Sequence, residues 1–250
     1  MPELPSVEFS RRLLQEHFAG SQIQRIDVAE DSMIFGDLTE YMLKSQMHLK
    51  TIEKIERHGK FIWLVLSEDG NHSCLLMHFG MTGFVQVRGA KRFFYKSAPE
   101  KEDNTEVWPP KYTKLIVKAE TMDGQKAEFV FGDARRLGQI KLIVNCNNPR
   151  TVPPLNELGF DAFLEMPPLN DFSKMLTRKI GLKSLLLDQS FAAGIGNWMA
   201  DDVSIQFPFI CCRLCTKPTF IHPPEFAILA KSRREIYMKR SKPLQRLHVL

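Results

Sequence analysis

The chain has 250 residues, of which 44% are hydrophobic and 25% charged, a composition typical of a soluble globular protein with one large domain or two smaller ones. Its formal net charge of +5 is compatible with an anionic partner but does not require one. No apolar run approaches the roughly 18 residues of a membrane span, and the charged first twenty residues are unlike a signal peptide, so we expect an intracellular protein that binds no membrane.

The first half of the chain predicts one helix followed by many short strands. Residues 6–18 are rich in helix formers, with Val7, Leu14 and Phe18 spaced to share a face. Strand-like runs then follow, separated by turn signals such as those around Gly70 and Gly124. They cover residues 23–28, 61–66, 73–77, 84–87, 114–119, 127–131 and 139–144. This spacing is typical of an antiparallel sandwich or barrel.

The second half changes to helical patterns after a polar, proline-bearing stretch at residues 146–155, which we interpret as a linker. Helices are predicted over residues 169–176, 182–191, 198–207 and 225–239. The fold class is therefore α+β. It combines an N-terminal antiparallel β-sandwich domain opened by one helix (residues 1–145) with an all-helical helix-two-turn-helix domain that ends in a basic tail (residues 156–250). That tail fits either a solvated surface or a phosphate-binding one.

A Gly-x-Gly turn lies between two of the predicted helices. Gly194 and Gly196 let the backbone approach a ligand closely, and Asn197 stands where it could cap the next helix. Free N–H groups at a helix start form a seat for phosphate. A plain helix-turn-helix corner explains the same residues equally well.

The amino terminus carries a second chemical signal. Removal of Met1 before a small residue leaves Pro2 as a secondary amine, and an α-amino pKa near ~8 leaves part of it unprotonated at neutral pH. Such an amine is a nucleophile, and the iminium it forms is an electron sink like a lysine Schiff base. Glu3 stands beside it as a general acid or base. The alternative is a proline-flanked helix start with an exposed glutamate.

Five segments occur in one order along the chain, namely residues 2–5 (Pro-Glu-Leu-Pro), 57–60 (Arg-His-Gly-Lys), 78–83 (His-Phe-Gly-Met-Thr-Gly), 133–138 (Asp-Ala-Arg-Arg-Leu-Gly) and 187–197 (from Leu-Asp-Gln to Gly-Asn). Together they resemble the formamidopyrimidine-DNA glycosylase and endonuclease VIII family, and the sequence between them is most similar to its plant and fungal members. The resemblance covers nearly the whole chain. It implies a base-excision-repair enzyme that removes oxidised bases from double-stranded DNA through a Schiff base to the terminal proline. The same enzyme would cleave the abasic site by β,δ-elimination, without a cofactor or metal.

The resemblance also implies roles for single residues. Pro2 would be the nucleophile, Glu3 its acid/base partner, and Lys60 a phosphate contact that supports catalysis; otherwise Lys60 is a surface lysine. Met81 would be a wedge in the gap left by the extruded nucleotide, where the alternative is an ordinary core methionine. Further DNA contacts would come from Arg135 facing the orphaned base, from Arg136 as a structural or phosphate-binding residue, and from Lys183 and Asn197 on the backbone.

The chain departs from the family pattern at three places. Ser6 stands where most members have glutamate, which puts the tuning of the amine in doubt. Leu137 stands where many have phenylalanine, so stacking on the opposite strand would be weaker because leucine has no ring face. No β-hairpin finger is visible before Leu250, so a basic tail would have to substitute in part or activity would be reduced.

Five cysteines, an odd number, do not indicate a disulfide framework. Cys212 and Cys215 have metal-ligand spacing, but a second such pair is missing, so free thiols are preferred over zinc.

We expect a monomer whose partner is DNA with oxidised bases or abasic sites, placed in the nucleus if the source is plant or fungal. A binder of damaged or abasic DNA with little turnover is the alternative. A helix-turn-helix module without lesion chemistry would leave the amino terminus unexplained.

Overall fold

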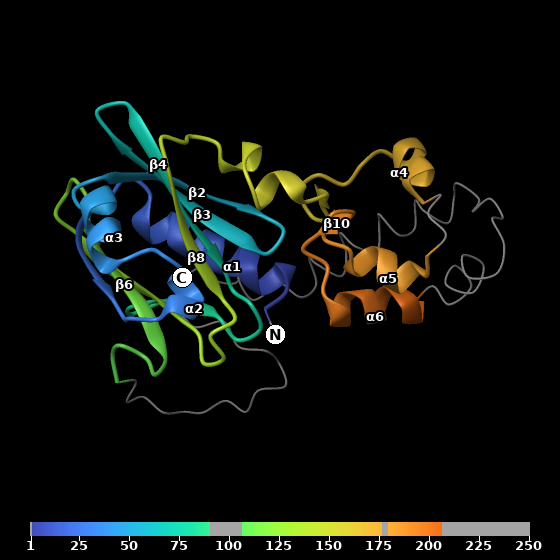
Figure 1. The fold of residues 1–250 in the computed structure, drawn as a ribbon, viewed down its shortest axis with the longest axis horizontal. Coiled ribbons are helices and arrows are strands. Elements are labelled where there is room, and N and C mark those ends of the chain that lie inside the picture. The colour runs from blue at the N-terminus through green and yellow to red at the C-terminus, as the bar shows by residue number, and fades with distance from the viewer. Residues whose placement is uncertain (1, 91–106, 177–179, 207–250) are drawn as a thin grey trace, which may run out of the picture. The chain divides into compact units, whose positions relative to one another are not determined.

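The computed structural model describes residues 2–90, 107–176 and 180–206 of the chain. These residues form two compact units that meet in sequence between Leu158 and Gly159 (Figure 1). Each unit is described by itself below.

The first unit is built on helix α1 (Leu4–Phe18) and an eight-stranded, wholly antiparallel sheet with the order β5-β7-β6-β1-β2-β3-β4-β8. The strands are β1 (Gln22–Val28), β2 (Thr51–His58), β3 (Phe61–Glu68), β4 (Asn71–His78), β5 (Phe84–Val87), β6 (Thr113–Glu120), β7 (Lys126–Gly132) and β8 (Gln139–Val144). All seven predicted strands are present, most of them one or two residues longer than predicted. The sequence analysis missed β2, because consecutive charged residues interrupt its apolar ones.

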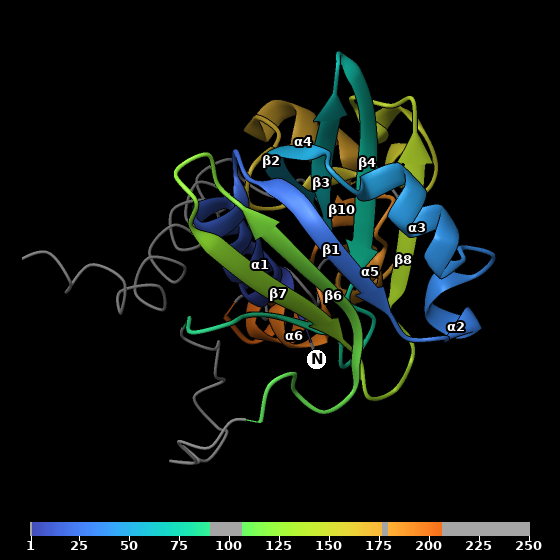
Figure 2. The same ribbon diagram turned by 90° about the vertical axis from the view of Figure 1, so that its left-hand side faces the viewer.

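The sheet folds into a sandwich at the junction of β1 and β2. These two strands pair only at Gln22 and Thr51, so the strands β5-β7-β6-β1 form one layer and β2-β3-β4-β8 the other. Figure 2 shows β7, β6 and β1 side by side in the first layer. The predicted antiparallel β-sandwich is therefore confirmed.

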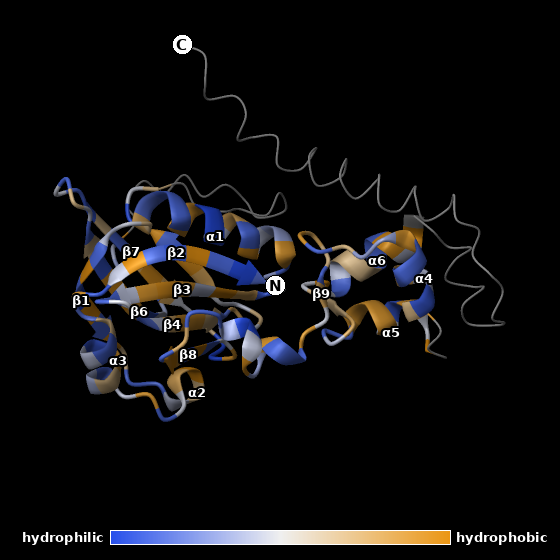
Figure 3. Ribbon diagram, turned by 90° about the horizontal axis from the view of Figure 1, so that it is seen from above, coloured by the Kyte–Doolittle hydropathy of each residue, from blue (hydrophilic) through white to orange (hydrophobic). Residues whose placement is uncertain are grey.

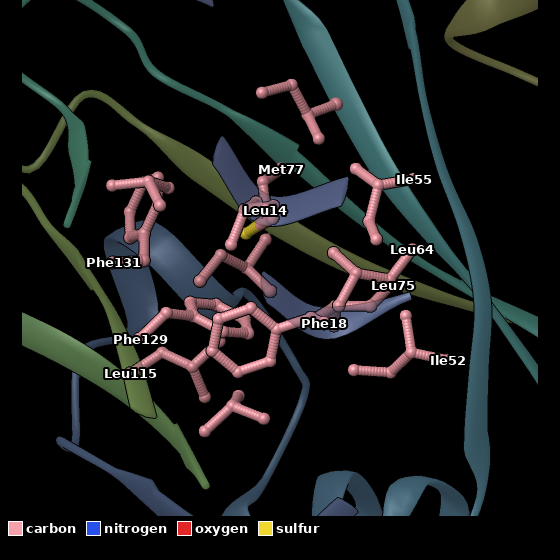
Figure 4. Close-up of a cluster of buried hydrophobic side chains, with 14 of the residues drawn as sticks. Leu14, Phe18, Ile52, Ile55, Leu64, Leu75, Met77, Leu115, Phe129 and Phe131 are labelled. Carbon is pink, nitrogen blue, oxygen red and sulfur yellow. The ribbon is translucent and has the colours of Figure 1, made fainter. Parts of the chain in front are cut away.

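Hydrophobic side chains from both layers and from α1 form one core. Phe18 of α1 meets Phe129 of β7 edge to face, with ring centroids 4.9 Å apart. Both rings are fully buried, and burial of such a side chain contributes ~1.5–3 kcal/mol. The helix is amphipathic, as its mixed colour in Figure 3 shows, and its apolar side faces this core. Core residues labelled in Figure 4 are Leu14, Phe18, Ile52, Ile55, Leu64, Leu75, Met77, Leu115, Phe129 and Phe131.

Two loops cross between the layers at one end of the sandwich. Residues 79–83 connect β4 in the second layer to β5 in the first, and residues 133–138 connect β7 in the first layer back to β8 in the second. Because β4 pairs with β8 and β5 pairs with β7, the two crossover loops run side by side. This arrangement places two short, glycine-containing segments next to each other although they are about 50 residues apart in sequence.

The stretch that we interpreted as a linker is packed on the first unit. It contains two 3-10 helices, η1 (Pro149–Thr151) and η2 (Leu155–Glu157), and Leu155 is buried in a second hydrophobic cluster on the sheet, beside Trp63 and Cys74. Apolar contact thus holds this segment on the sheet, and the unit boundary falls after Leu158 instead of before residue 156.

In the same cluster, the Cys74 thiol donates to the carbonyl of Cys146 at 3.2 Å, and burial, aided by the neighbouring Cys146, raises the pKa of Cys74 to about 12.

Two short helices between β1 and β2 were also missed by the sequence analysis. They are α2 (Ser32–Phe35) and α3 (Glu40–Met47), and each begins at a side chain that caps it. The Asp31 carboxylate accepts the N–H of Met33, and the Thr39 hydroxyl accepts the N–H of Met42. The capping residues were the available signal, but such short helices show little periodicity.

The second unit contains α4 (Leu169–Met175), α5 (Leu182–Leu187) and α6 (Asn197–Gln206). It is not purely helical, because β9 (Phe160–Asp161) pairs in parallel with β10 (Ala192–Ala193). Its core contains three aromatic rings, Phe160, Phe172 and Phe191, with centroids 5.6 to 6.1 Å apart. The prediction that α5 would run to residue 191 is wrong, because the Asp188 carboxylate accepts the N–H of Ser190 and ends the helix in a turn.

The helix predicted at residues 225–239, the basic tail and the cysteines at 211, 212 and 215 lie outside the described residues. Within the described ranges, no helix has the length and hydrophobicity needed to cross a membrane.

Candidate functional site

The predicted nucleophile lies directly before the first helix. Pro2 is partly buried and Glu3 fully buried, and α1 begins at the next residue. Ser6 closes the first turn: its Oγ accepts the N–H of Glu3 at 3.1 Å and donates to the carbonyl oxygen of Glu3 at 2.8 Å. The serine that departs from the family pattern therefore has a local role, because it fixes the backbone that carries Glu3 and Pro2.

Lys60 is brought to this helix start from the turn between β2 and β3. Gly59 there has a φ of +56°, a left-handed conformation that glycine adopts without strain. Burial lowers the pKa of Lys60, and the negative charge of Glu3 partly opposes that shift. The structure thus places the predicted Glu3 and Lys60 close enough for their charges to interact.

His78, at the end of β4, adjoins the same lysine. Burial lowers the pKa of His78 to about 4, with a smaller contribution from the Lys60 ammonium. Its imidazole is therefore neutral at pH 7. Nδ1 accepts the N–H of Gly80 at 3.3 Å, which leaves the proton on Nε2. The sequence analysis quoted His78 only as part of a segment and gave it no role.

A buried ion pair ties α1 to the turn that carries Lys60. The side chain of Arg57 is 0% exposed, and its guanidinium donates to Glu8 Oε2 and to the Gly59 carbonyl oxygen, each at 2.9 Å. Burial by itself would raise the pKa of Glu8, but hydrogen bonds from Arg11, Arg12 and Arg57 outweigh it and bring that pKa to about 2. Sequence reasoning missed this pair, because Glu8 and Arg57 are 49 residues apart and belong to no local pattern.

The predicted wedge residues Met81 and Arg135 come together on the two crossover loops. Met81 is 41% exposed, so it is not the core methionine of the alternative interpretation. Arg135 is also exposed, and its Nη1 lies 3.8 Å from the Met81 sulfur. Leu137, in the same loop as Arg135, is exposed as well. Met81, Arg135 and Leu137 therefore lie exposed together at the crossover end of the sandwich.

Arg136 has a different environment from Arg135. Its guanidinium donates to both carboxylate oxygens of Asp31 at 2.9 to 3.0 Å, and Lys114 pairs with the same carboxylate at 2.8 Å. Burial raises the pKa of Asp31, but the bonds from Arg136 and Lys114 bring it to about 2. Arg136 thus holds its loop to the start of α2.

In the second unit, Asn197 is the exposed first residue of α6, and Lys183 on α5 pairs with Asp201 on α6. The turn between these helices is organised by Gln189, which donates to the carbonyls of Leu187 and Ile195 and accepts the N–H of Gly194. The amide of Gln189 therefore supplies hydrogen bonds to backbone groups of the turn that have no backbone partner within it. The sequence analysis included Gln189 in the segment of residues 187–197 but did not predict this role.

The described residues hold no group of three or more His, Cys, Asp or Glu side chains that could bind a metal ion. The spacing at Cys212 and Cys215 lies outside those residues.

Comparison with known proteins places these features in context. The model of the formamidopyrimidine-DNA glycosylase N-terminal domain matches residues 1–140. A formamidopyrimidine-DNA glycosylase of Arabidopsis thaliana is 38% identical over 207 residues, which cover 82% of this chain and 50% of that protein. One from Desulfitobacterium hafniense is 30% identical over 221 residues, 87% of this chain and 72% of that protein. The chain therefore spans about half the length of the Arabidopsis relative.

Solved structures show the same fold. A complex of Lactococcus lactis Fpg with DNA containing an abasic site matches 96% of this chain and 79% of that protein, with a TM-score of 0.69 and 22% identity. A Lactococcus variant bound to Fapy-dG-containing DNA matches 100% of this chain and 83% of that protein, with the same TM-score and identity.

Proposed function

The chain belongs to the formamidopyrimidine-DNA glycosylase family, and from this premise we propose that it removes oxidised bases from double-stranded DNA and cleaves the strand at the resulting abasic site. The observation that carries the proposal is the group formed by Pro2, Glu3 and Lys60. Pro2, which becomes a terminal secondary amine once Met1 is removed, precedes a buried carboxylate whose charge interacts with the lysine. A buried acid next to an amine is the arrangement that moves protons during imine chemistry.

The reaction begins when the nitrogen lone pair of Pro2 forms a bond to C1′ of the damaged nucleotide. The glycosidic bond breaks, and the base leaves with a proton. The sugar ring then opens: the C1′–O4′ bond breaks, O4′ takes a proton, and the nitrogen lone pair completes a C1′=N iminium. The iminium acidifies the C2′ proton, so loss of that proton expels the 3′ phosphate, and a second elimination expels the 5′ phosphate. Glu3 moves the protons. Lys60 holds an adjacent phosphate, and neutral His78 beside it offers an N–H donor to the same anion.

Access to C1′ requires that the nucleotide leave the base stack, which costs a few kcal/mol. The exposed Met81 and Arg135 fill the vacated space, the methionine by apolar contact and the arginine by facing the orphaned base. Lys183 and Asn197 bind the DNA backbone, the latter at the N-terminal end of α6, where the positive end of the helix dipole attracts phosphate. Arg136 supports the loop. A plant or fungal source would place this chemistry in the nucleus.

Borohydride trapping on an abasic-site duplex tests the proposal. The expected result is a covalent adduct that peptide mass spectrometry maps to residue 2. Pro2→Gln retains Met1 and displaces the amine, so trapping is lost while salt-dependent DNA binding persists. Pro5→Ala removes the other proline of the same segment and serves as the matched control, with trapping retained.

Intact binding without any adduct in the wild-type protein would overturn the lyase mechanism. That result favours the second candidate, a protein that binds abasic DNA without turnover. An adduct mapped to Lys60 would instead show that Pro2 is not the nucleophile.

A further inference from the structure

The two crossover loops touch through their backbones. A Cβ added to Gly80 in residues 79–83 would lie 2.5 Å from the carbonyl carbon of Leu137 in residues 133–138, so no side chain fits between the loops. Within the first loop, the N–H of Gly83 donates to the carbonyl oxygen of Phe79 at 2.8 Å and closes a tight turn. Met81 therefore projects from a short, closed turn that rests directly on the neighbouring loop.

One hydroxyl group joins the loops. Thr82 Oγ1 donates to Asp133 Oδ1 and accepts the N–H of Arg135 at 3.1 Å. Thr82 directly follows Met81 in the sequence. Its hydroxyl therefore links the backbone beside Met81 to the backbone N–H of Arg135. A second contact between the loops is the one from Arg135 Nη1 to the Met81 sulfur at 3.8 Å.

Asp133 is the fixed point of the second loop. Its side chain is fully buried, and its carboxylate also accepts the N–H groups of Arg135 at 3.1 Å, Leu137 at 2.8 Å and Gly138 at 2.7 Å. Burial opposes the charge on Asp133, but the Thr82 hydroxyl and these amides keep its pKa below the usual range. Hydrogen bonds to a buried carboxylate are stronger than neutral ones, so the loop that carries Arg135 is firmly held.

We infer that Thr82 and Asp133 are positioning residues that couple Met81 and Arg135, so that the two side chains enter DNA as one preformed wedge. The inference rests on the proposed function. Its physical reason is that side chains on separate, freely moving loops lose conformational entropy when they insert, whereas loops already locked to each other lose little. The coupling acts through position, since neither Thr82 nor Asp133 is required to touch the DNA.

The test uses the full chain and a duplex with a tetrahydrofuran abasic site opposite 2-aminopurine, whose fluorescence rises when the base is unstacked. Thr82→Val keeps the side-chain shape and removes the hydroxyl, and Thr82→Ser restores it. Thr121→Val is the matched control, because its hydroxyl accepts the N–H of Gln125 in the turn at the opposite end of the β6–β7 hairpin.

We expect Thr82→Val to bind the abasic duplex about tenfold more weakly, with a smaller fluorescence rise at saturation. Affinity for undamaged duplex stays unchanged, and Thr82→Ser and Thr121→Val behave as wild type. All titrations are run well below each variant's melting temperature. As a second measurement, Met81→Ala costs less affinity in the Thr82→Val background than in the wild type, because the wedge is already uncoupled.

A Thr82→Val protein with the wild-type ratio of abasic to undamaged affinity would overturn the inference, as would an equal cost of Met81→Ala in both backgrounds. If the wild-type protein itself shows no preference for the abasic duplex, the proposed function fails, and the inference fails with it. The wild-type titration therefore separates the two failures.

Discussion

The buried ion pair between Glu8 and Arg57 predicts a specific loss of stability when the carboxylate is neutralised. In Glu8→Gln the guanidinium of Arg57, which is fully buried, loses its bond to a negative oxygen. The pKa of Glu8 falls from 4.5 to about 2 in the folded protein. Each tenfold difference in proton affinity corresponds to ~1.4 kcal/mol, so the ionised carboxylate contributes about 3 kcal/mol at neutral pH. Removing one partner of a buried pair costs a similar ~3–5 kcal/mol.

The sign of the pH dependence follows from the lowered pKa. A group that binds its proton less tightly when folded contributes its full stabilisation above pH 4.5 and loses it as the pH falls toward about 2. The gap in free energy of unfolding between wild type and Glu8→Gln should therefore be about 3 kcal/mol at pH 7 and shrink steadily below pH 4.5.

Urea denaturation followed by circular dichroism, repeated from pH 7 to pH 2.5, measures that gap. Glu16→Gln on the exposed side of the same helix is the control, and its unfolding free energy should stay within ~0.5 kcal/mol of wild type. The reasoning is refuted if Glu8→Gln is no less stable than Glu16→Gln at pH 7, or if the gap does not change with pH.

Further predictions concern the two units separately. Gly80→Ala should lower the free energy of unfolding by more than ~1 kcal/mol, because φ is +54° and the new Cβ would meet the neighbouring loop; an unchanged thermal melt would contradict this. Asp31→Asn should cost about 2 kcal/mol through weaker bonds from Arg136 and Lys114, as measured in urea, and full stability would show that the pairs are dispensable. Gln189→Leu should speed hydrogen exchange of amides in the turn before α6, whereas unchanged protection would mean that the turn holds without this side chain.

Strand positions were predictable from the sequence because short apolar, β-branched or aromatic runs between turn residues are a local signal. The strand over Thr51–His58 escaped prediction because charged residues fall at consecutive positions within it. Helix α5 ended earlier than predicted for a different reason. Leucines at residues 185–187 continue an apolar pattern, but one side-chain oxygen of Asp188 is enough to turn the chain.

The site was predictable only where its residues stand in recognisable segments. Pro2, Glu3 and Lys60 were predicted in this way, and the structure brings Glu3 and Lys60 within reach of each other's charge. The buried pairs that hold the neighbouring turn and the crossover loops were not predicted, since Glu8–Arg57 and Thr82–Asp133 join positions 49 and 51 residues apart. Such pairs arise from strand register and crossover connections, which no short pattern encodes.

The sulfur of Cys74 bears on how the protein withstands the conditions that generate its proposed substrates. Burial raises the pKa of Cys74 to about 12, so its thiol stays protonated at pH 7, whereas a few per cent of an ordinary cysteine is ionised. Peroxides react with the thiolate and not with the protonated form. A burst of oxidant that damages DNA would therefore leave this sulfur in its reduced state, and the outer face of β4 would keep its packing through the stress.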